Sequence, residues 1–242
     1  MNIQLQPEYI FSLKGFWITN TFFTSILVSL FLIVLALNFR FFKRNIFIKG
    51  LEFLIIELLK FSDWVTGNRK FSYQVLPLIA TFFLFIVTAN LFALFPGFLG
   101  AFFVKIDGRQ LPLLRSPNSD LTTTLALAIF SVGSIQYFSL KKLGFWKFIK
   151  RFINLTNPLK FILGFFEIIS EGTKLLSFSF RLFGNIFAGE ILLLVIGFLL
   201  PYFIPLPFMI LEIFVGIIQA FIFSALTLTF IKGAIIRFES EK

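Results

Sequence analysis

The sequence predicts an all-α, polytopic helical membrane protein with about five transmembrane helices, one interfacial amphipathic helix and a long, tilted helix hairpin at its C-terminal end. Of its 242 residues, 58% are hydrophobic and only 14% are charged, whereas soluble domains carry about 25% charged residues. Several apolar runs approach or exceed the ~20 residues that a helix needs to cross a bilayer. No long linker, low-complexity segment or internal repeat divides the chain, so we expect a single membrane domain over 1–242.

The first transmembrane helix is expected at about 16–39. Residues 1–15 carry Glu8 and one basic residue, Lys14, and no small-residue cleavage site closes the apolar run. Because a secretory signal peptide needs a basic start and such a site, we expect this run to remain as an anchor.

The next segment, about 42–70, is expected to lie in the membrane interface as an amphipathic helix that does not cross. Apolar residues such as Ile48 and Leu51 recur at helical spacing, while Lys49 and Glu52 belong to a separate polar face. This pattern is typical of interfacial helices. A cytoplasmic surface helix packed against protein would show the same pattern.

Four further crossings follow, and the fourth crossing of the chain is unusually long. We expect them at about 74–97, 121–140, 161–200 and 208–236, with a basic connector over 141–160 and a tight loop marked by Pro201, Pro205 and Pro207. As one helix, forty residues would run about 60 Å, against a bilayer core of ~30 Å. Such a helix either tilts steeply within the membrane or extends its first turns into water.

The distribution of Lys and Arg sets the expected orientation. With five crossings and the N-terminus outside, sixteen of them fall on the cytoplasmic side and four on the outside. This matches the excess of basic residues in the cytoplasmic loops of membrane proteins. Such loops also explain the net charge of +10, so we expect no nucleic-acid partner.

Polar residues form a stripe along one face of the fourth crossing. At 100° per residue, the members of this stripe fall within about 80° of one another, and they are Glu167, Glu171, Lys174, Arg181 and Asn185. Glu190 falls about 180° from Arg181, on the opposite face. In the last crossing, Glu212 and Gln219 are seven residues apart and form a second stripe.

These groups are costly inside a membrane, and the cost indicates a function. Each ionisable group at membrane depth costs at least ~2.5–3.5 kcal/mol unless it finds water or a partner. A guanidinium stays protonated in proteins, so Arg181 must face an anion or a wet cavity. Glu190 and Glu212 can take up a proton, as carboxyls in proton relays do. A structural ion pair between Arg181 and a Glu of the neighbouring helix remains an alternative.

Small and polar residues beside these stripes have two interpretations each. Ser177 and Gly184 lie near the Arg181 face and would let another helix approach closely, whether that helix belongs to a partner or to this chain. Asp120 directly precedes the third crossing, where an Asp is expected to cap the helix. A polar residue there would also suit the mouth of a channel, and the two roles are compatible.

The chain has no Cys and no His. This excludes disulfides, thiolate catalysis and Cys-based metal sites, and it removes the commonest acid–base group and metal ligand at neutral pH. We therefore expect no cofactor and no metal.

Five segments together resemble one known family. Residues 177–190 read SFSFRLFGNIFAGE, which resembles the most diagnostic segment of subunit a of F-type ATP synthases; the pattern RLFGN-x-x-AGE is highly specific. Further similar segments are NLFALFPG (90–97), SPNSDLTTTLALA (116–128), FEIISE (166–171) and GIIQAFIFSALTLTFI (216–231). The resemblance extends from about residue 16 to about residue 236.

The resemblance implies a non-catalytic subunit that forms two offset half-channels against a ring of c subunits. Protons entering from outside would neutralise a ring carboxylate and leave by the second half-channel after nearly a full turn, which couples proton flow to ring rotation and ATP synthesis. It also implies the b subunits of the peripheral stalk as partners, the F1 sector as an indirect partner, and the lipid bilayer as surroundings. A bacterial plasma membrane is favoured over an organelle inner membrane.

The same resemblance implies residue roles. Arg181 would separate the half-channels and attract the returning ring carboxylate, with Asn185 as its polar neighbour. Glu190, Glu212 and Gln219 would belong to the outer half-channel and Glu167 to the inner one. Further residues that would line the channels are Asn90, Asp120, Glu171, Lys174 and Ser177. The family often has His at the position of Glu212, and some members carry an acidic residue at the position of Ala93, so the path here must use carboxylates, amides and water.

Three other functions stay open. A secondary transporter, with Arg181 binding an anionic substrate, predicts two pseudo-symmetric halves, and the sequence shows none. A structural membrane subunit with an internal Arg–Glu ion pair predicts that Arg181 tolerates replacement by Gln. A self-contained ion channel would conduct without a ring of partner subunits.

Overall fold

The computed structural model describes residues 9–13, 16–39, 46–92, 94, 103–106, 109–112, 114–152, 158–200 and 203–236. Within these residues, five helices are long and apolar enough to cross a membrane, and they are α1 (Asn20–Phe39), α3 (Arg69–Phe92), α4 (Leu121–Leu143), α6 (Pro158–Leu199) and α7 (Pro205–Ile236). The predicted fold class, an all-α membrane protein with about five crossings, is confirmed.

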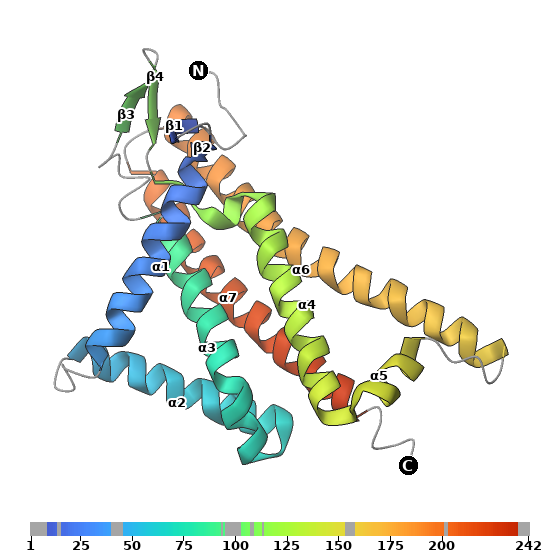
Figure 1. Cartoon of the computed structure of the whole chain (residues 1–242). Helices are drawn as coiled ribbons and strands as arrows, with labels where there is room; N and C mark the ends of the chain where they lie inside the picture. The colour runs from blue at the N-terminus through green and yellow to red at the C-terminus, as the bar shows by residue number, and fades with distance from the viewer. Residues whose placement is uncertain are drawn as a thin grey trace.

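The amphipathic segment forms helix α2 (Ile46–Thr66), which runs across the end of the molecule between α1 and α3 (Figure 1). It ends at Thr66, directly before Gly67, whose φ of 67° is readily adopted only by glycine. The side chain of Asn68 then accepts hydrogen bonds from the backbone N–H groups of Lys70 and Phe71, at 3.0 and 3.2 Å, and so caps α3. The second crossing therefore begins at Arg69, earlier than the predicted start at 74.

Two further helix starts are also earlier than predicted, and both are prolines. The helix α6 begins at Pro158 and α7 begins at Pro205. Proline is tolerated in the first turn because its missing N–H would have no partner there. Pro205 and Pro207 thus belong to the first turn of α7, and the prediction that they form a loop is wrong; Pro201 lies outside the described residues.

The segment between α3 and α4 contains structure that the apolar pattern does not reveal. A short 3₁₀ helix, η2 (Pro117–Ser119), precedes α4, and Asp120 caps α4 as expected by accepting a hydrogen bond from the backbone N–H of Thr122 at 2.9 Å. After α4, the basic connector includes a helix, α5 (Phe145–Phe152). Residues 93, 95–97 and 153–157 lie outside the described residues.

Two short antiparallel hairpins lie at the end of the molecule opposite α2 and α5 (Figure 1). One pairs β1 (Tyr9–Leu13) with β2 (Phe16–Thr19), and the other pairs β3 (Phe103–Ile106) with β4 (Arg109–Pro112). The first crossing consequently starts as a helix at Asn20, after a strand in the region predicted to be helical from 16.

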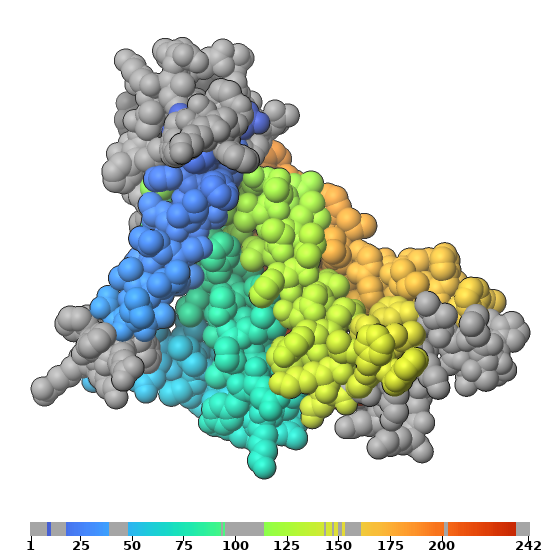
Figure 2. All heavy atoms as spheres, in the orientation of Figure 1, coloured from blue at the N-terminus to red at the C-terminus, as the bar shows by residue number. Residues whose placement is uncertain are grey.

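The core joins α3, α4, α6 and α7. Phe82 and Ile86 of α3, Leu182 of α6 and Phe223 of α7 belong to one buried apolar cluster. From the face shown in Figure 2, α3 and α4 cover α7, and α6 projects beyond α4. The 42 residues of α6 lie at an angle to α3 (Figure 1), as expected for a helix too long to cross upright.

Candidate functional site

Arg181 lies half-buried near the middle of α6, on the side that faces α7. Its Nη2 donates a hydrogen bond to Ser177 Oγ, one turn earlier, at 3.1 Å. Among the carboxylates of the described residues, none forms an ion pair with Arg181. The permanently charged guanidinium therefore has a hydroxyl partner on α6 and no counter-ion among the described residues.

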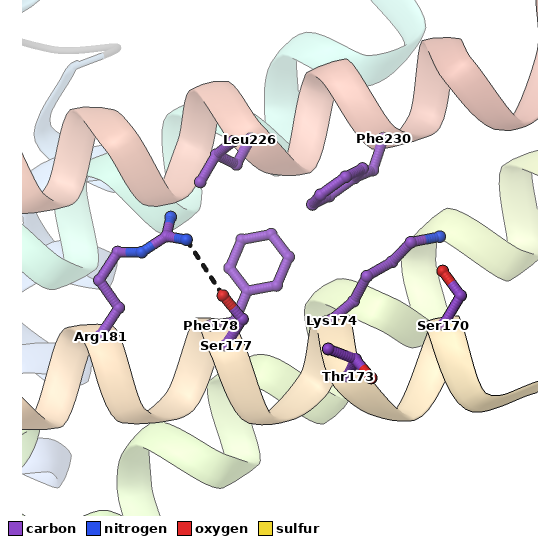
Figure 3. A pocket seen from close by; sticks show the side chains of 8 residues that line it. All are labelled: Ser170, Thr173, Lys174, Ser177, Phe178, Arg181, Leu226 and Phe230. Atoms are coloured by element: carbon purple, nitrogen blue, oxygen red, sulfur yellow. Dashed lines mark hydrogen bonds between the residues drawn. The ribbon is translucent and has the colours of Figure 1, made fainter.

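On one side of Arg181, a hollow of about 350 Å³ opens between α6 and α7; we call it the Lys174 hollow. Figure 3 shows Arg181, Ser177 and Lys174 directed from α6 toward the side of α7 that carries Leu226 and Phe230. The hollow is lined by Ser170, Thr173, Lys174, Ser177, Phe178, Arg181, Leu226 and Phe230. It therefore lies on the N-terminal side of Arg181 along α6.

The charges in and near this hollow are partly paired. Lys174 Nζ forms an ion pair with Glu171 Oε1 at 2.8 Å and lies 5.2 Å from the centre of the Phe230 ring, within the range of a cation–π contact. Both charged side chains of the pair are less than 20% exposed. Glu167 is half-buried about one turn before Glu171, beyond the residues that line the hollow.

On the other side of Arg181, the two helices are bridged by amides. Asn185 Nδ2 donates a hydrogen bond to Gln219 Oε1 at 2.8 Å. Beyond this bridge is a second hollow of about 80 Å³, which we call the Glu212 hollow. It is lined by Asn185, Gly189, Leu192, Leu193, Phe208, Leu211, Glu212 and Val215. The predicted stripe of α7 thus faces α6 across this hollow.

The Glu212 carboxyl packs directly against the backbone of α6 at Gly189. A Cβ atom at position 189 would lie only 3.0 Å from both Cδ and Oε1 of Glu212, which is tighter than nine in ten Cβ contacts in proteins. Glycine at this position therefore allows the carboxyl of α7 to reach α6, immediately beside Glu190. The sequence predicted both carboxylates, but it did not predict the role of Gly189.

Glu190 lines neither hollow and contacts the segment before η2. Its Oε1 lies 2.8 Å from Nε of Arg115, whose side chain is only 8% exposed. The predicted position of Glu190 on the face opposite Arg181 agrees with this contact. Arg115 itself was counted only as a loop charge, because the sequence gives no sign that residues 114–119 are buried.

Next to Arg115, buried polar side chains join several helices. Asn118 Nδ2 donates to Asn90 Oδ1 at 2.7 Å, and Asn90 Nδ2 donates to the carbonyl of Gly216 at 3.3 Å. Thr21 Oγ1 donates to Asp120 Oδ2 at 3.1 Å. Asn90 and Asp120, two expected channel-lining residues, thus connect η2 to α1, α3 and α7, and Asn90 is only 5% exposed.

The arrangement is therefore a line of polar groups along the α6–α7 hairpin, with a hollow on each side of one permanent cation. Carboxyls stand near both hollows, Glu171 beside one and Glu212 in the other. In the described part of the chain, no cluster of three metal-ligating side chains is present. The groups can bind, release and order protons or water, and they do not form a nucleophile–base pair.

The sequence matches one protein family over most of its length. A family model described as "ATP synthase A chain" matches residues 18–232. A protein of Moorella thermoacetica called ATP synthase subunit a is 34% identical over 164 residues, which are 68% of this chain and 66% of that protein. A protein of the same name from Campylobacter jejuni is 35% identical over 171 residues, 69% and 67% of the two chains.

A third relative gives the same result. The ATP synthase subunit a of Legionella pneumophila is 34% identical over 161 residues, which are 66% of this chain and 61% of that protein. The chain therefore spans about two thirds of the length of the curated relatives that it matches.

Proposed function

The chain belongs to the ATP synthase A chain family, that of subunit a of F-type ATP synthases, and on this premise we propose that it carries protons through the membrane sector of a rotary ATP synthase. It forms two offset half-channels against a ring of c subunits, with Arg181 between them. Proton flow through the half-channels turns the ring and drives ATP synthesis elsewhere in the complex. The subunit itself performs no covalent chemistry.

One observation carries this proposal, namely the position of Arg181 between two hollows, with no counter-ion supplied by the part of the chain that the structure describes. A permanent cation at membrane depth needs an anion or water. A carboxylate brought by a partner helix would meet this need, and the cation would favour its ionised form. The same positive charge opposes the passage of a proton from one hollow directly to the other.

The two hollows correspond to the two proposed half-channels. The Glu212 hollow, with Asn185 and the bridging Gln219, lies toward the end that carries the strands, and the distribution of Lys and Arg supports an outside position for this end. The Lys174 hollow lies toward the cytoplasmic end, where Ser177, Lys174, Glu171 and Glu167 follow one another along α6. A proton would therefore enter by one hollow and leave by the other only through the ring.

The proposed partners fit the exposed apolar surface of the hairpin. Large side chains of α6 and α7 stand exposed, among them Leu176 (50%), Phe180 (54%) and Phe214 (62%). Such a surface suits lipid or membrane helices. We propose that the c ring covers the part nearest Arg181, and that b subunits and the bilayer cover other faces. F1 would be reached through the stalk, and the membrane would be a bacterial plasma membrane.

The alternatives account less well for these features. An internal Arg–Glu ion pair requires a carboxylate beside Arg181, and the described residues supply none. A secondary transporter built from repeats would have paired helices of similar length. In the described chain, the 42-residue α6 and the 32-residue α7 have no counterpart of comparable length. A self-contained channel would conduct protons without the ring, and measuring conduction by the isolated chain distinguishes it from the proposed function.

The test is passive proton permeability of the purified complex in vesicles, with and without Arg181→Gln. We expect the wild-type subunit to co-purify with a ring of short hairpin proteins that carry a membrane-embedded carboxyl. The Gln variant should assemble and leak protons without turning the ring, because the electrostatic barrier is gone. Arg69→Gln, at the turn between α2 and α3, is the matched control. A tight, fully coupled Gln variant would contradict the proposal, as would conduction by the isolated chain.

A further inference from the structure

We propose that Arg115 is a positioning residue for the outer half-channel: it keeps Glu190 ionised and in place, so that the neighbouring Glu212 is the carboxyl that binds and releases the translocated proton. This inference rests on the proposed function. It gives different roles to two carboxyls that the sequence pattern does not distinguish: Glu190 is a fixed anion and Glu212 carries the proton.

The first observation is the ion pair between Arg115 and Glu190. Nε of Arg115 and Oε1 of Glu190 are 2.8 Å apart, and the two side chains are 8% and 26% exposed. Removing one partner of such a pair leaves an uncompensated buried charge. The guanidinium keeps its proton, so Arg115 supplies a permanent counter-charge to Glu190.

The second observation is that Arg115 is held in place by its surroundings. Its backbone N–H donates to Thr24 Oγ1 of α1 at 3.3 Å, and it lies two residues before η2, whose residues are buried. The adjacent Ser116 donates from Oγ to Asn90 Oδ1 at 3.4 Å. Arg115 is therefore bonded to α1, and its neighbour Ser116 is bonded to α3.

The third observation is that Glu212 and Glu190 face different surroundings. Glu212 lines the Glu212 hollow together with Asn185, whereas neither Glu190 nor Arg115 does so. The carboxyl of Glu212 nevertheless lies against Gly189, the residue next to Glu190. The two acids are thus close enough to interact, while of the two only Glu212 lines the hollow beside Asn185.

Electrostatics then assign the proton. Two neighbouring carboxylates in a site of low dielectric constant disfavour being charged together, so that one of them holds a proton more readily. The Arg115 cation stabilises the charge on Glu190, and the proton is left to Glu212. Among the described residues, the charged groups nearest to Glu212 are Glu190 on α6 and Arg115, which pairs with Glu190.

The proton step is a transfer without change of oxidation state. A proton from the outer water forms an O–H bond with a carboxylate oxygen of Glu212. That bond then breaks as the proton passes, directly or through water, to a carboxylate of the ring, and Glu212 regains its charge. Glu190 and Arg115 keep their charges throughout the cycle.

The experiment measures ATP-driven proton pumping per assembled complex in membrane vesicles that hold the whole synthase. Arg115→Gln should lower pumping about tenfold or more, because an unpaired buried carboxylate now competes with Glu212 for the proton. Glu190→Gln should lower pumping too, because the Arg115 cation, no longer facing Glu190, then holds Glu212 in its charged form. Arg115→Lys, which keeps the charge, should retain most of the pumping.

The decisive variant combines Arg115→Gln with Glu190→Gln. Removing both charges together should restore pumping well above either single variant, since Glu212 is then neither outcompeted nor held charged. The matched control combines Asp63→Asn with Arg69→Gln, which removes an ion pair at the α2–α3 turn, and should behave like wild type. Assembly is measured in parallel, because a purely structural pair would change the amount of complex and not its pumping rate.

Two outcomes would overturn the inference. A double variant with no more pumping than Glu190→Gln alone would make Glu190 itself a proton carrier. Normal pumping per complex in Arg115→Gln would reduce Arg115 to a structural residue. Failure of the proposed function looks different, because Arg181→Gln would then remain coupled whatever the state of Arg115.

Discussion

The two polar regions along α6 are built in opposite ways. Toward the strands, Arg115, Asn118 and Asn90 are less than 9% exposed and are bonded to α1, α3, α6 or α7. Around Arg181 and Lys174, polar groups instead line an open hollow between two helices. A polar group whose partners all lie within the chain joins helices together, whereas one that faces a hollow is available to water, protons or a partner.

This difference predicts which property of the complex a substitution in each region will change. Substitutions of Asn118 in the buried cluster should change stability and assembly. Substitutions at the hollows, and those of Arg115 through its contact with Glu190, should change proton flow. The predictions below compare the two responses and begin with the largest.

Replacing Glu212 by Leu should give the largest loss of proton flow. Because Glu212 lines its hollow, the change removes a proton-binding group with little loss of packing. We expect ATP-driven pumping to fall about a hundredfold or more, the usual scale for losing a proton-transfer group. The complex should assemble normally, as measured by the amount of subunit in purified membranes. Unchanged pumping would remove Glu212 from the path.

Replacing Gly189 by Ala should have a smaller effect of the same kind. The added methyl group would lie 3.0 Å from Cδ of Glu212, so the carboxyl must move away from α6. We expect pumping to fall about tenfold, because small displacements of a reacting group cost rate. Gly133→Ala on α4, where no atom lies within 4 Å of the new methyl group, is the control. Equal pumping in both variants would contradict the close packing of Glu212.

Replacing Asn118 by Leu should affect stability and leave proton flow per complex unchanged. Asn118 is 0% exposed and donates to Asn90 Oδ1, which would lose this partner. We expect the free energy of unfolding to fall by about 1–3 kcal/mol. Thermal inactivation of the detergent-solubilised complex measures the loss of stability. Pumping per assembled complex measures whether proton flow is unchanged. A specific loss of pumping would place Asn118 on the ion path.

The apolar runs and the 100° helical spacing predicted the hairpin better than they predicted its surroundings. The polar stripe of α6 and the position of Glu190 opposite Arg181 follow from helix geometry alone. The contact between Arg115 and Glu190 does not, because it joins residues 75 positions apart through a buried segment of polar sequence. An apolar pattern cannot reveal that the polar segment 114–119 is buried, because hydrogen bonds to neighbouring helices hold this segment in place.

Helix starts were missed for a similar reason. The charges of Arg69 and Lys70 suggested a continuation of the amphipathic segment, whereas Gly67 and the cap at Asn68 end one helix and begin the next. Pro205 suggested a loop but occupies the first turn of α7. Residue composition does not locate these two helix starts, because a capping hydrogen bond determines one and the backbone geometry of proline determines the other.

The most direct test of the central claim, that Arg181 separates two half-channels, is ATP synthesis by Arg181→Lys driven by an imposed proton gradient. Lys is a compact point charge that can lose its proton when desolvated, whereas the guanidinium is a permanent, broad set of donors. We predict that the Lys variant assembles with the ring and supports almost no coupled synthesis. Substantial coupled synthesis by Arg181→Lys would contradict the separator role and make Arg181 a structural cation.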